Sequence, residues 1–407
     1  MTAGPRVPPF ALKEAALSVD ITSRTAHIFL SCGEASGDRY GAALVAALRR
    51  INPDLRFSAL GGETLAAAGV EIVQSSEPIS VMGFGEVIGA LPRIFCARRK
   101  LNSRLAGGDI DIFLPIDFPG FNMSLARNAR RRGIPVFYLI APQLWAWASW
   151  RIGSLRRSVD RLGVVLPFEK KFFAERGIDV VNLGHPLAED YPREAVIRDR
   201  RDREMRLADD TAPLTIGLLP GSRRQELTRL LGVFLETIEL MRGLTGRRLE
   251  ILVSAAPGVD RELLEPARNL GCSIVDEPLP RLLPRLDLAL VCSGTASLET
   301  ALAGVPHSVA YRTSAFNYAI GRHLVKVDRI GLANLVLGED VTPEYIQGEA
   351  KPAVLAADLV DWLEEDRRRT QFGDRVDRLR AKLGGDGFWD RTAAAVAEFA
   401  AGAGMES

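Results

Sequence analysis

Residues 291–299 read Val-Cys-Ser-Gly-Thr-Ala-Ser-Leu-Glu, and they lie between an apolar run at 286–291 and a helix-like run at 298–303. This pattern predicts a strand, a loop of small residues and a helix. Such a loop leaves free backbone N–H groups and the positive end of the helix dipole facing one point, which suits a diphosphate. Taken alone the signal is weak, because glycine-rich turns from strand to helix are common in α/β proteins and often only close a turn.

A second loop of the same kind lies further upstream. The stretch 219–223 reads Leu-Pro-Gly-Ser-Arg, and it follows the apolar run 214–219 and precedes a helix opened by Glu226. Arg223 adds a planar guanidinium group that can bind a phosphate with two hydrogen bonds. Two such loops in one half of the chain, one of them with an arginine, favour a nucleotide site.

Length and composition limit the alternatives. A chain of 407 residues with 47% apolar content suggests two or three domains with full cores. The first 25 residues lack the layout of a signal peptide, and no run of about eighteen apolar residues occurs, so we expect a cytoplasmic chain. Residues 1–24 are expected to be a loose extension. The cysteines are far apart, form no C-x-x-C pair and indicate neither a disulfide framework nor a zinc site: Cys32, Cys96, Cys272 and Cys292.

The net charge of +1 hides a basic region at 80–161, which holds thirteen Arg or Lys against five Asp or Glu. Apolar side chains in this region recur at spacings of three and four and precede the basic triplet 98–100. An amphipathic helix with a basic flank suits a membrane surface, whereas the more common reading is a helix that packs on the core. The apolar side chains are Val81, Met82, Phe84, Val87, Ile88, Leu91, Ile94 and Phe95.

Three tryptophans, Trp145, Trp147 and Trp150, stand before further arginines, and aromatic residues among basic ones also occur in nucleic-acid-binding proteins. We do not expect nucleic acid as a partner, because the isoelectric point of the whole chain is about 7.7 and no nucleic-acid-binding module is present.

Short β-rich runs alternate with segments of helical periodicity along the chain, which is typical of repeated βα units. Two doubly wound, Rossmann-like halves that face one cleft are therefore expected, at 25–187 and 211–350. The predicted strands are 27–32, 110–116, 136–140, 216–219, 249–253 and 286–291, and the predicted helices include 40–51, 123–132 and 227–241.

Two segments fall outside this alternation. Residues 188–210 are rich in charge, contain Pro192 and lack a long apolar period, so we predict a linker there. Residues 351–407 are expected to form helices that return toward the first half.

Two carboxylates of the first half stand where α/β sheets place functional groups. Glu34 follows the first predicted strand in a glycine-containing turn, and Asp117 follows the strand 110–116 in the turn Asp-Phe-Pro-Gly. A carboxylate on such a turn could accept a proton from a hydroxyl, and burial would raise its pKa. Asp117 could equally be the N-cap of the next helix. His185 is either a group in the cleft or a packed residue at the hinge, and we favour the hinge.

An ordered set of motifs makes the chain resemble the lipid-A-disaccharide synthase family over residues 26–350. The motifs are Gly-Glu-Ala-Ser-Gly-Asp (33–38), Met-Gly (82–83) with Glu-Val (86–87), Asp117 with Phe-Asn (121–122), Trp-Ala-Trp (145–147), Leu-Pro-Phe-Glu (166–169), Gly-His-Pro (184–186), Pro-Gly-Ser-Arg (220–223) with Glu226, Ser-Gly-Thr (293–295) with Leu-Glu (298–299), and Asn334.

The resemblance implies a GT-B fold and an inverting glycosyl transfer in lipid A and lipopolysaccharide biosynthesis that needs neither a metal ion nor another cofactor. The implied donor is UDP-2,3-diacylglucosamine and the implied acceptor is 2,3-diacylglucosamine 1-phosphate. The products would be the β-1,6-linked tetraacyl-disaccharide 1-phosphate and UDP.

The resemblance also implies roles for particular residues. Asp117 would activate the 6-hydroxyl of the acceptor, and Arg223 would hold the donor diphosphate in place of a metal ion. Glu34 is a further candidate for the catalytic group, with no role assigned. The candidates for substrate binding are Ser222, Ser293, Gly294 and Thr295 at the UDP phosphates, Glu299 at a ribose hydroxyl, and Asn334 and Gln347 at polar positions of the family.

Because both implied substrates carry long acyl chains, the resemblance favours the interpretation of residues 81–100 as a membrane-surface helix over that of a helix packed on the core. We then expect a peripheral protein on the cytoplasmic face of the inner membrane, with Val81, Met82, Phe84, Val87, Ile88 and Leu91 in contact with lipid or acyl chains. The last segment could be exchanged between protomers of a homodimer. The stretch Ala-Pro-Gln-Leu at 141–144 departs from the family pattern and leaves the acyl-chain preference open.

Two other classes remain. Another UDP-GlcNAc-using enzyme with the GT-B fold, either a peptidoglycan glycosyltransferase or a 2-epimerase, would share the two halves and the diphosphate loops. A non-catalytic lipid-binding protein would make Asp117 and Arg223 incidental.

Overall fold

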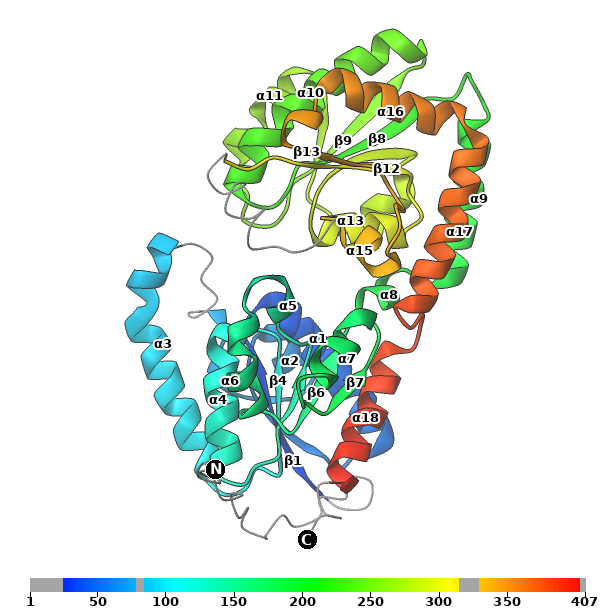
Figure 1. The fold of residues 1–407 in the computed structure, drawn as a ribbon. Helices are drawn as coiled ribbons and strands as arrows, with labels where there is room; N and C mark the ends of the chain where they lie inside the picture. The colour runs from blue at the N-terminus through cyan, green and yellow to red at the C-terminus, as the bar shows by residue number, and fades with distance from the viewer. Residues whose placement is uncertain (1–24, 78–83, 315–328, 403–407) are drawn as a thin grey trace, which may run out of the picture.

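The computed structural model describes residues 25–77, 84–314 and 329–402. They form two α/β halves joined along one side by helices (Figure 1). The loose extension expected at 1–24 lies outside the described residues, and so do Val81 and Met82.

The first half is built on a parallel sheet in which seven described strands have the order β3-β2-β1-β4-β5-β6-β7. Its strands are β1 (His27–Cys32), β2 (Arg56–Gly61), β3 (Glu71–Ser75), β4 (Ile112–Ile116), β5 (Phe137–Leu139), β6 (Arg161–Val164) and β7 (Val180–Asn182). Its helices are α1 (Ala35–Ile51), α2 (Glu63–Ala67), α3 (Phe84–Leu105), α4 (Pro119–Arg131), α5 (Leu144–Trp147), α6 (Ile152–Arg156) and α7 (Pro167–Ala174).

The second half repeats the plan with six described strands in the order β10-β9-β8-β11-β12-β13. Its strands are β8 (Leu214–Leu219), β9 (Leu249–Ser254), β10 (Ser273–Val275), β11 (Leu288–Cys292), β12 (His307–Tyr311) and β13 (Glu344–Ile346). Its helices are α10 (Arg224–Thr245), α11 (Glu265–Asn269), α12 (Leu279–Leu282), α13 (Thr295–Leu302) and α15 (Leu332–Leu337).

The central strands of both sheets are continuous apolar runs. Every residue of β1, β4 and β11 is buried, as expected for parallel strands covered by helices on both faces. In both sheets the strand order reverses at the first strand, β1 or β8, beside β4 or β11. Loops at the carboxyl ends of these strands are where doubly wound sheets bind ligands. The prediction of two doubly wound halves is confirmed.

The segment expected to be a linker is largely helical. It contains α8 (Leu187–Asp190) and the longer α9 (Arg193–Leu207). The buried Arg203 fixes α9 to the second half, because its guanidinium donates to the carbonyl oxygens of Leu286 and Gly304, both at 2.7 Å. A helix anchored by one buried arginine needs no long apolar face, which is why periodicity gave no sign of it.

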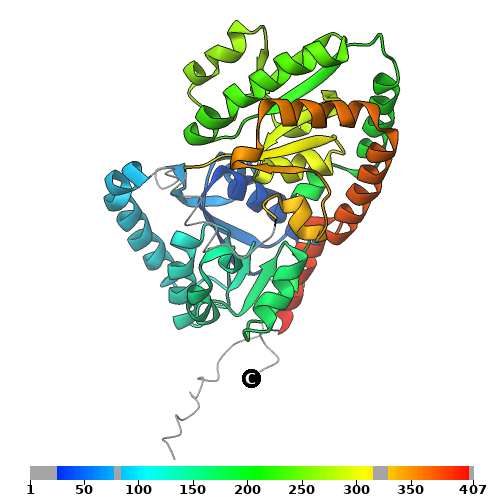
Figure 2. The same ribbon diagram turned by 45° about the horizontal axis from the view of Figure 1, so that its top comes forward.

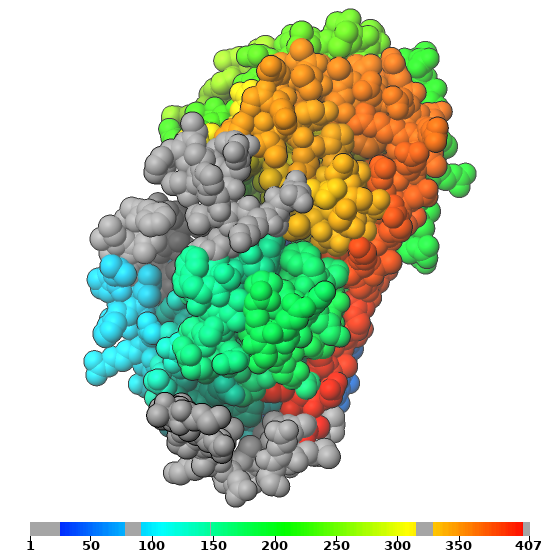
Figure 3. Space-filling view, viewed as in Figure 1, coloured from blue at the N-terminus to red at the C-terminus, as the bar shows by residue number. Residues whose placement is uncertain are grey.

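The last described residues form three helices that do not all return to the first half. They are α16 (Pro352–Glu364), α17 (Asp366–Lys382) and α18 (Phe388–Gly402). Helix α16 packs on α10 of the second half, whereas α18 packs on α1 of the first half. Helix α17 runs along the edge of the molecule between them, as the orange and red atoms in Figure 3 show.

The chain thus crosses between the halves twice, and the two crossings touch. The backbone N–H of His185 donates to the carbonyl oxygen of Leu383 at 2.8 Å. A Cβ on Gly184, whose φ is +82°, would lie 2.5 Å from that same oxygen, so a side chain at 184 would force the crossings apart. Burial lowers the pKa of His185 to about 4, so this histidine is a neutral, packed hinge residue, as favoured from the sequence.

Candidate active site

The two loops expected to bind a diphosphate leave the same edge of the second sheet. Strands β8 and β11 are neighbours, with Leu219 opposite Val291, so the loops that follow them start side by side. The thiol of Cys292, the last residue of β11, lies within electrostatic range of Glu226 and Arg223 at the 220–223 loop. Burial and the charge of Glu226 raise its pKa to about 12, while Arg223 acts in the opposite direction.

Glu226 holds the 220–223 loop in place. Its Oε2 accepts the backbone N–H groups of Ser222 and Arg223 at 3.0 and 3.1 Å. Gly221 adopts a φ of +111°, and a Cβ there would lie 2.5 Å from the same oxygen. The guanidinium of Arg223 reaches 3.3 Å from Glu226 Oε1 and remains 79% exposed. The structure therefore leaves the arginine side chain available to an anion, whereas the loop amides are already satisfied.

The second loop opens helix α13. Ser293 is engaged by the fold, since its N–H donates to Ala310 and its hydroxyl to Ile330, both at 3.1 Å. Gly294 is the N-cap residue with a φ of +148°. The N–H groups of the first helical residues have no acceptor within the helix, so those of Thr295 and Ala296 can face an anion, whereas the N–H of Ser297 already donates to the carbonyl oxygen of Gly294 at 3.2 Å.

Glu299 lies one turn further along α13 and is bound by the hinge. The hydroxyl of Tyr191 donates to Glu299 Oε2 at 2.7 Å. Burial and the charge of Asp190 raise the pKa of Glu299, while the Tyr191 hydrogen bond and Arg39 lower it.

Asp117 stands on a strained turn at the carboxyl end of β4. Asp117 and Phe118 both adopt the left-handed region, with φ of +47° and +52°, which is unfavourable for residues with a Cβ. Phe118, and not Asp117, is the N-cap residue of α4, so the N-cap alternative is wrong.

Three buried side chains hold this turn. The amide of Asn122 donates to the carbonyl oxygens of Asp117 and Ser31, at 2.8 and 3.0 Å. The Ser31 hydroxyl donates back to Asn122 Oδ1 at 2.5 Å, and Tyr138 donates its hydroxyl to the Asp117 carbonyl at 2.6 Å. A Cβ on Gly33 would lie 2.0 Å from the Phe118 ring, so only glycine allows the β1 and β4 loops to interlock.

The carboxyl group of Asp117 has a pKa suited to a general base. Desolvation by the protein around the carboxyl group and the negative charge of Glu34 raise its pKa to about 6, against the Phe118 backbone N–H, which lowers it, although Asp117 keeps an exposed surface toward solvent. Glu34 is exposed at the start of α1. The structure therefore brings Asp117 and Glu34 together.

The pKa of Tyr40 depends on charges from both halves. Burial raises its pKa to about 12, and charges from both sides contribute: Asp190 at the hinge, Glu299 of the second half and Asp117 of the first. The charges of Glu299 and Asp117 therefore both raise the pKa of this one tyrosine.

Asn334 and Gln347 lie in the same half, and both are engaged internally. Asn334 is 1% exposed, and its amide group bonds the backbone of Val341 and Thr342 as well as the carboxylate of Glu344. Gln347, at a φ of +53°, accepts the N–H of Thr313 at 3.1 Å. Asn334 therefore shapes the loop between α15 and β13, and a direct contact of its side chain with substrate would require these bonds to break.

A sequence Asp-Ile-Asp occurs at 109–111, at the amino end of β4 and so at the opposite edge of the sheet from Asp117. Asp109 pairs with Arg104, and Asp111 accepts the N–H of His27 at 2.8 Å. Among the described residues no group of three or more His, Cys, Asp or Glu is arranged to hold a metal ion.

The segment expected at the membrane is helix α3, which stands at the side of the first half (Figure 2). One stripe of the helix is buried, with Ala97, Leu101 and Leu105 against the core, whereas Leu91 and Phe95 are 53% and 69% exposed. The side chains of Phe84, Val87 and Ile88 lie outside the described ones. No helix in the described ranges is long and apolar enough to span a bilayer.

Sequence reasoning named Glu169 and Trp145 only as members of motifs, without a role, and it missed Tyr191. Glu169 is fully buried and accepts the indole N–H of Trp145 at 2.9 Å and the backbone N–H of Leu166 at 3.0 Å. Its position three residues after Leu166 is the pattern of a helix-capping glutamate, a signal that was available. Tyr191 gave no signal, because its partner Glu299 is remote in sequence.

Two doubly wound halves, with the loops after β8 and β11 on one and Asp117 after β4 on the other, define a protein of the GT-B fold class. Solved structures agree on the fold: MurG of Acinetobacter baumannii has a TM-score of 0.52 at 18% identity, covering 87% of this chain and 95% of that one. The UDP-GlcNAc 2-epimerase of Neisseria meningitidis, bound to UDP-GlcNAc, has a TM-score of 0.56 at 11% identity, covering 92% and 99%.

The family model of lipid-A-disaccharide synthetase matches residues 28–395. Lipid-A-disaccharide synthase of Syntrophus aciditrophicus is 38% identical over 370 residues, which cover 90% of this chain and 96% of the relative. That of Geobacter sulfurreducens is 37% identical over 384 residues, covering 93% and 98%. The chain belongs to the lipid-A-disaccharide synthase family, and the epimerase and peptidoglycan alternatives are not favoured.

Proposed function

We propose that the chain transfers 2,3-diacylglucosamine from UDP-2,3-diacylglucosamine to 2,3-diacylglucosamine 1-phosphate, releasing UDP and forming the β-1,6-linked tetraacyl-disaccharide 1-phosphate. The observation that carries the proposal is membership of the family, supported by the positions of Asp117 and Arg223, which follow the central strands β4 and β8 of the two halves.

On the donor side, the exposed guanidinium of Arg223 and the N-terminus of α13 bind the diphosphate. Ser222, Ser293, Gly294 and Thr295 contribute to the walls of this anion site, and Glu299 accepts from a ribose hydroxyl. As the bond from C1 of the sugar to the phosphate oxygen breaks, the negative charge that develops on UDP is stabilised by the arginine and the helix dipole. These groups supply the compensation that other enzymes obtain from a metal ion.

On the acceptor side, Asp117 removes the proton from the 6-hydroxyl as its oxygen attacks C1 from the face opposite UDP, which inverts the configuration. A carboxyl group with a pKa of about 6 is ionised at neutral pH and still a competent base. Glu34 keeps that pKa high. Asn334 and Gln347 shape the second half near the donor.

The acyl chains of both substrates require access to a bilayer. Helix α3 supplies it: Leu91 and Phe95 are exposed, and Arg98 and Arg99 follow them on the helix. Val81, Met82, Phe84, Val87 and Ile88, which precede Leu91 in the sequence, are the other apolar residues that we propose for contact with lipid or acyl chains. The protein then works as a peripheral enzyme on the cytoplasmic face of the inner membrane, and the C-terminal segment could pair protomers in a homodimer.

The test is UDP release from purified protein supplied with UDP-2,3-diacylglucosamine in detergent and EDTA, with and without the 1-phosphate acceptor. Acceptor-dependent release, together with a tetraacyl disaccharide detected by mass spectrometry, is the expected result. Release without acceptor would instead indicate a hydrolase-like or epimerase activity. Binding to liposomes with no release would indicate the lipid-binding alternative.

A further inference from the structure

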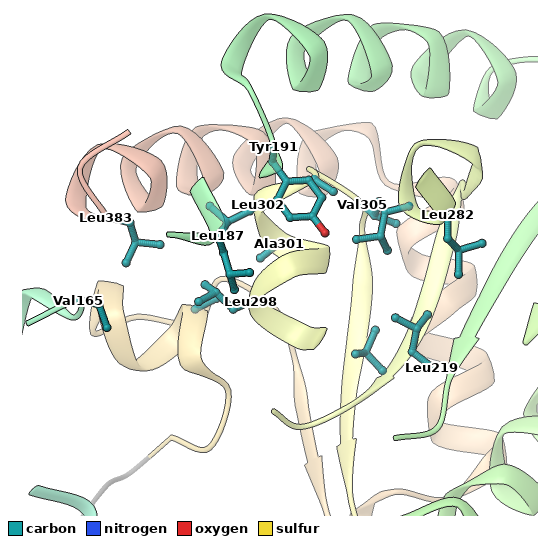
Figure 4. Packing of buried hydrophobic residues seen from close by; sticks show 14 of the residues in the cluster. Val165, Leu187, Tyr191, Leu219, Leu282, Leu298, Ala301, Leu302, Val305 and Leu383 are labelled. Atoms are coloured by element: carbon teal, nitrogen blue, oxygen red, sulfur yellow. The ribbon is translucent and has the colours of Figure 1, made fainter. Parts of the chain in front are cut away.

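Tyr191 lies in the first crossing between the halves, between α8 and α9, and is 4% exposed. Figure 4 shows its ring above helix α13, which carries Leu298 and Leu302, with the hydroxyl directed toward that helix. The ring packs in the same hydrophobic cluster as those leucines. Packing therefore fixes the direction in which the hydroxyl points, toward the helix that carries Glu299.

The Tyr191 hydroxyl forms a hydrogen bond with the second half, and the Tyr191 carbonyl group forms one with the second crossing. The hydroxyl donates to Glu299 Oε2 at 2.7 Å. The carbonyl oxygen of Tyr191 accepts a hydrogen bond from Arg380, whose guanidinium also bonds Asp386 at 2.8 Å. One residue thus links the Glu299 carboxylate to both crossings.

The carboxylate needs such a partner because its surroundings do not fix it otherwise. Asp190 repels it and Arg39 attracts it, but among the described contacts Tyr191 is the hydrogen-bond donor recorded for its oxygens. With Oε2 occupied by the tyrosine, Oε1 is left to accept from a ligand hydroxyl. A hydrogen bond to a charged acceptor is also stronger and more directional than one between neutral groups.

We infer that Tyr191 is a positioning residue for the donor: it orients Glu299 so that the carboxylate accepts from a ribose hydroxyl, and so ties nucleotide recognition to the hinge. This inference rests on the ribose role proposed for Glu299. It differs from a purely structural role for Tyr191, because it predicts an effect that depends on the hydroxyls of the ligand.

The test compares UDP with 2′,3′-dideoxy-UDP by calorimetric titration of the full chain and of Tyr191→Phe, which keeps the packed ring. The native protein should bind UDP more tightly than the dideoxy analogue. In Tyr191→Phe the Kd for UDP should rise roughly tenfold, as expected for loss of an interaction of about 1.4 kcal/mol, while the Kd for the analogue stays unchanged. With the donor sugar, KM should rise and kcat should change little.

Two controls make the comparison specific. Thr237→Val removes one buried hydrogen bond, to Val233 in α10, and should leave both Kd values unchanged. In a Glu299→Ala background, Tyr191→Phe should have no further effect on the ratio of the two Kd values.

An equal loss of affinity for both ligands, or no change for either, overturns the inference about Tyr191. If the native protein is an active synthase but binds both ligands equally well, Glu299 does not bind the ribose hydroxyls. The inference about Tyr191 is then overturned as well, because it rests on that role. A native protein that binds UDP and discriminates but makes no disaccharide contradicts the proposed function and leaves the Tyr191 result to stand on its own.

Discussion

The side-chain amide of Asn122 donates to the carbonyl oxygen of Asp117 at 2.8 Å, and the hydroxyl of Tyr138 donates to the same oxygen at 2.6 Å. Two buried side chains thus stabilise a turn whose left-handed backbone conformation is otherwise unfavourable. The direction of the proposed catalytic carboxylate therefore depends on residues that do not touch substrate.

Asn122→Ala should reduce both stability and turnover. It removes the amide that donates to the carbonyl oxygens of Ser31 and Asp117 and leaves the buried Ser31 hydroxyl without its acceptor, which costs about 2–3 kcal/mol of the free energy of unfolding. The left-handed turn can then relax and move the carboxylate, so kcat should fall while the KM for the donor stays similar. Urea unfolding and steady-state kinetics measure the two effects.

Asn128→Ala is the matched control, since Asn128 lies in the same helix and bonds Asn102 at 2.9 Å away from the turn. It should lose some stability and keep its kcat. Equal kinetics in the two variants would argue against a role for Asn122 in placing Asp117.

The acid limb of the pH profile of kcat/KM should follow the ionisation of the Asp117 carboxyl group. Since its pKa is raised to about 6, kcat/KM should increase with pH up to about 6 and then level, because the ionised form is the base. The charge of Glu34 raises that pKa, so Glu34→Gln should move the limb to lower pH. Asp117→Asn should abolish turnover at every pH while UDP binding persists.

Glu175→Gln, at the exposed C-cap position after α7, serves as the control and should leave the limb in place. If Glu34→Gln left the midpoint unchanged, or moved it upward, the proposed electrostatic coupling between Glu34 and Asp117 would be wrong.

Arg223→Ala should be far more damaging than Arg224→Ala. Both side chains are largely exposed, at 79% and 72%, but Arg223 points from the diphosphate loop, whereas Arg224 pairs with Asp260 at 3.0 Å. Loss of a charged group that stabilises the leaving group typically costs about 10²–10³ in rate. We expect a fall of that order in kcat/KM for Arg223→Ala, partial recovery in Arg223→Lys, and near-native kinetics in Arg224→Ala. Similar kinetics for the two alanine variants would remove Arg223 from the site.

The main strands and the two loops of the second half could be predicted from the sequence because their signals are local. The run that forms β1 is largely apolar, and Gly221 and Gly294 each come two residues after the end of a strand. The position of Asp117 after β4 was a similar local signal.

The supports of the site could not be predicted, because they join residues remote in sequence. Asn122 meets Ser31 across 91 positions, and Tyr191 meets Glu299 across 108. Helix α9 was not predicted for a related reason. Its contact with the second half depends on a hydrogen bond from Arg203 to the carbonyl oxygen of Leu286 and not on a long apolar face of the helix.

Asp109→Asn should affect acid stability and leave turnover intact. Hydrogen bonding and charge from Arg104 hold the pKa of Asp109 well below its ordinary value of 3.8. The pair therefore stabilises the fold above pH 3.8, and this contribution is lost as the pH falls below that value. The Asp109 side chain is 44% exposed, so solvent screening limits the effect to about 1 kcal/mol or less.

Melting curves between pH 3 and 7 should show a smaller gap between native protein and Asp109→Asn at the acid end. Synthase activity with EDTA should be the same for both proteins. An activity loss in the variant that added Mg²⁺ or Mn²⁺ modified would instead give the Asp-Ile-Asp sequence a catalytic role.

Membrane contact through α3 can be separated from catalysis by Phe95→Ser. Phe95 is 69% exposed and lies one turn before Arg98, so its ring can enter the interfacial layer while the arginine meets anionic headgroups. We expect weaker sedimentation with anionic liposomes, slower turnover of substrates in liposomes, and unchanged kinetics in detergent. Val354→Ser, which alters a valine that is 40% exposed on α16 of the other half, should change none of these. Native liposome binding by Phe95→Ser would place the membrane contact elsewhere on the molecule.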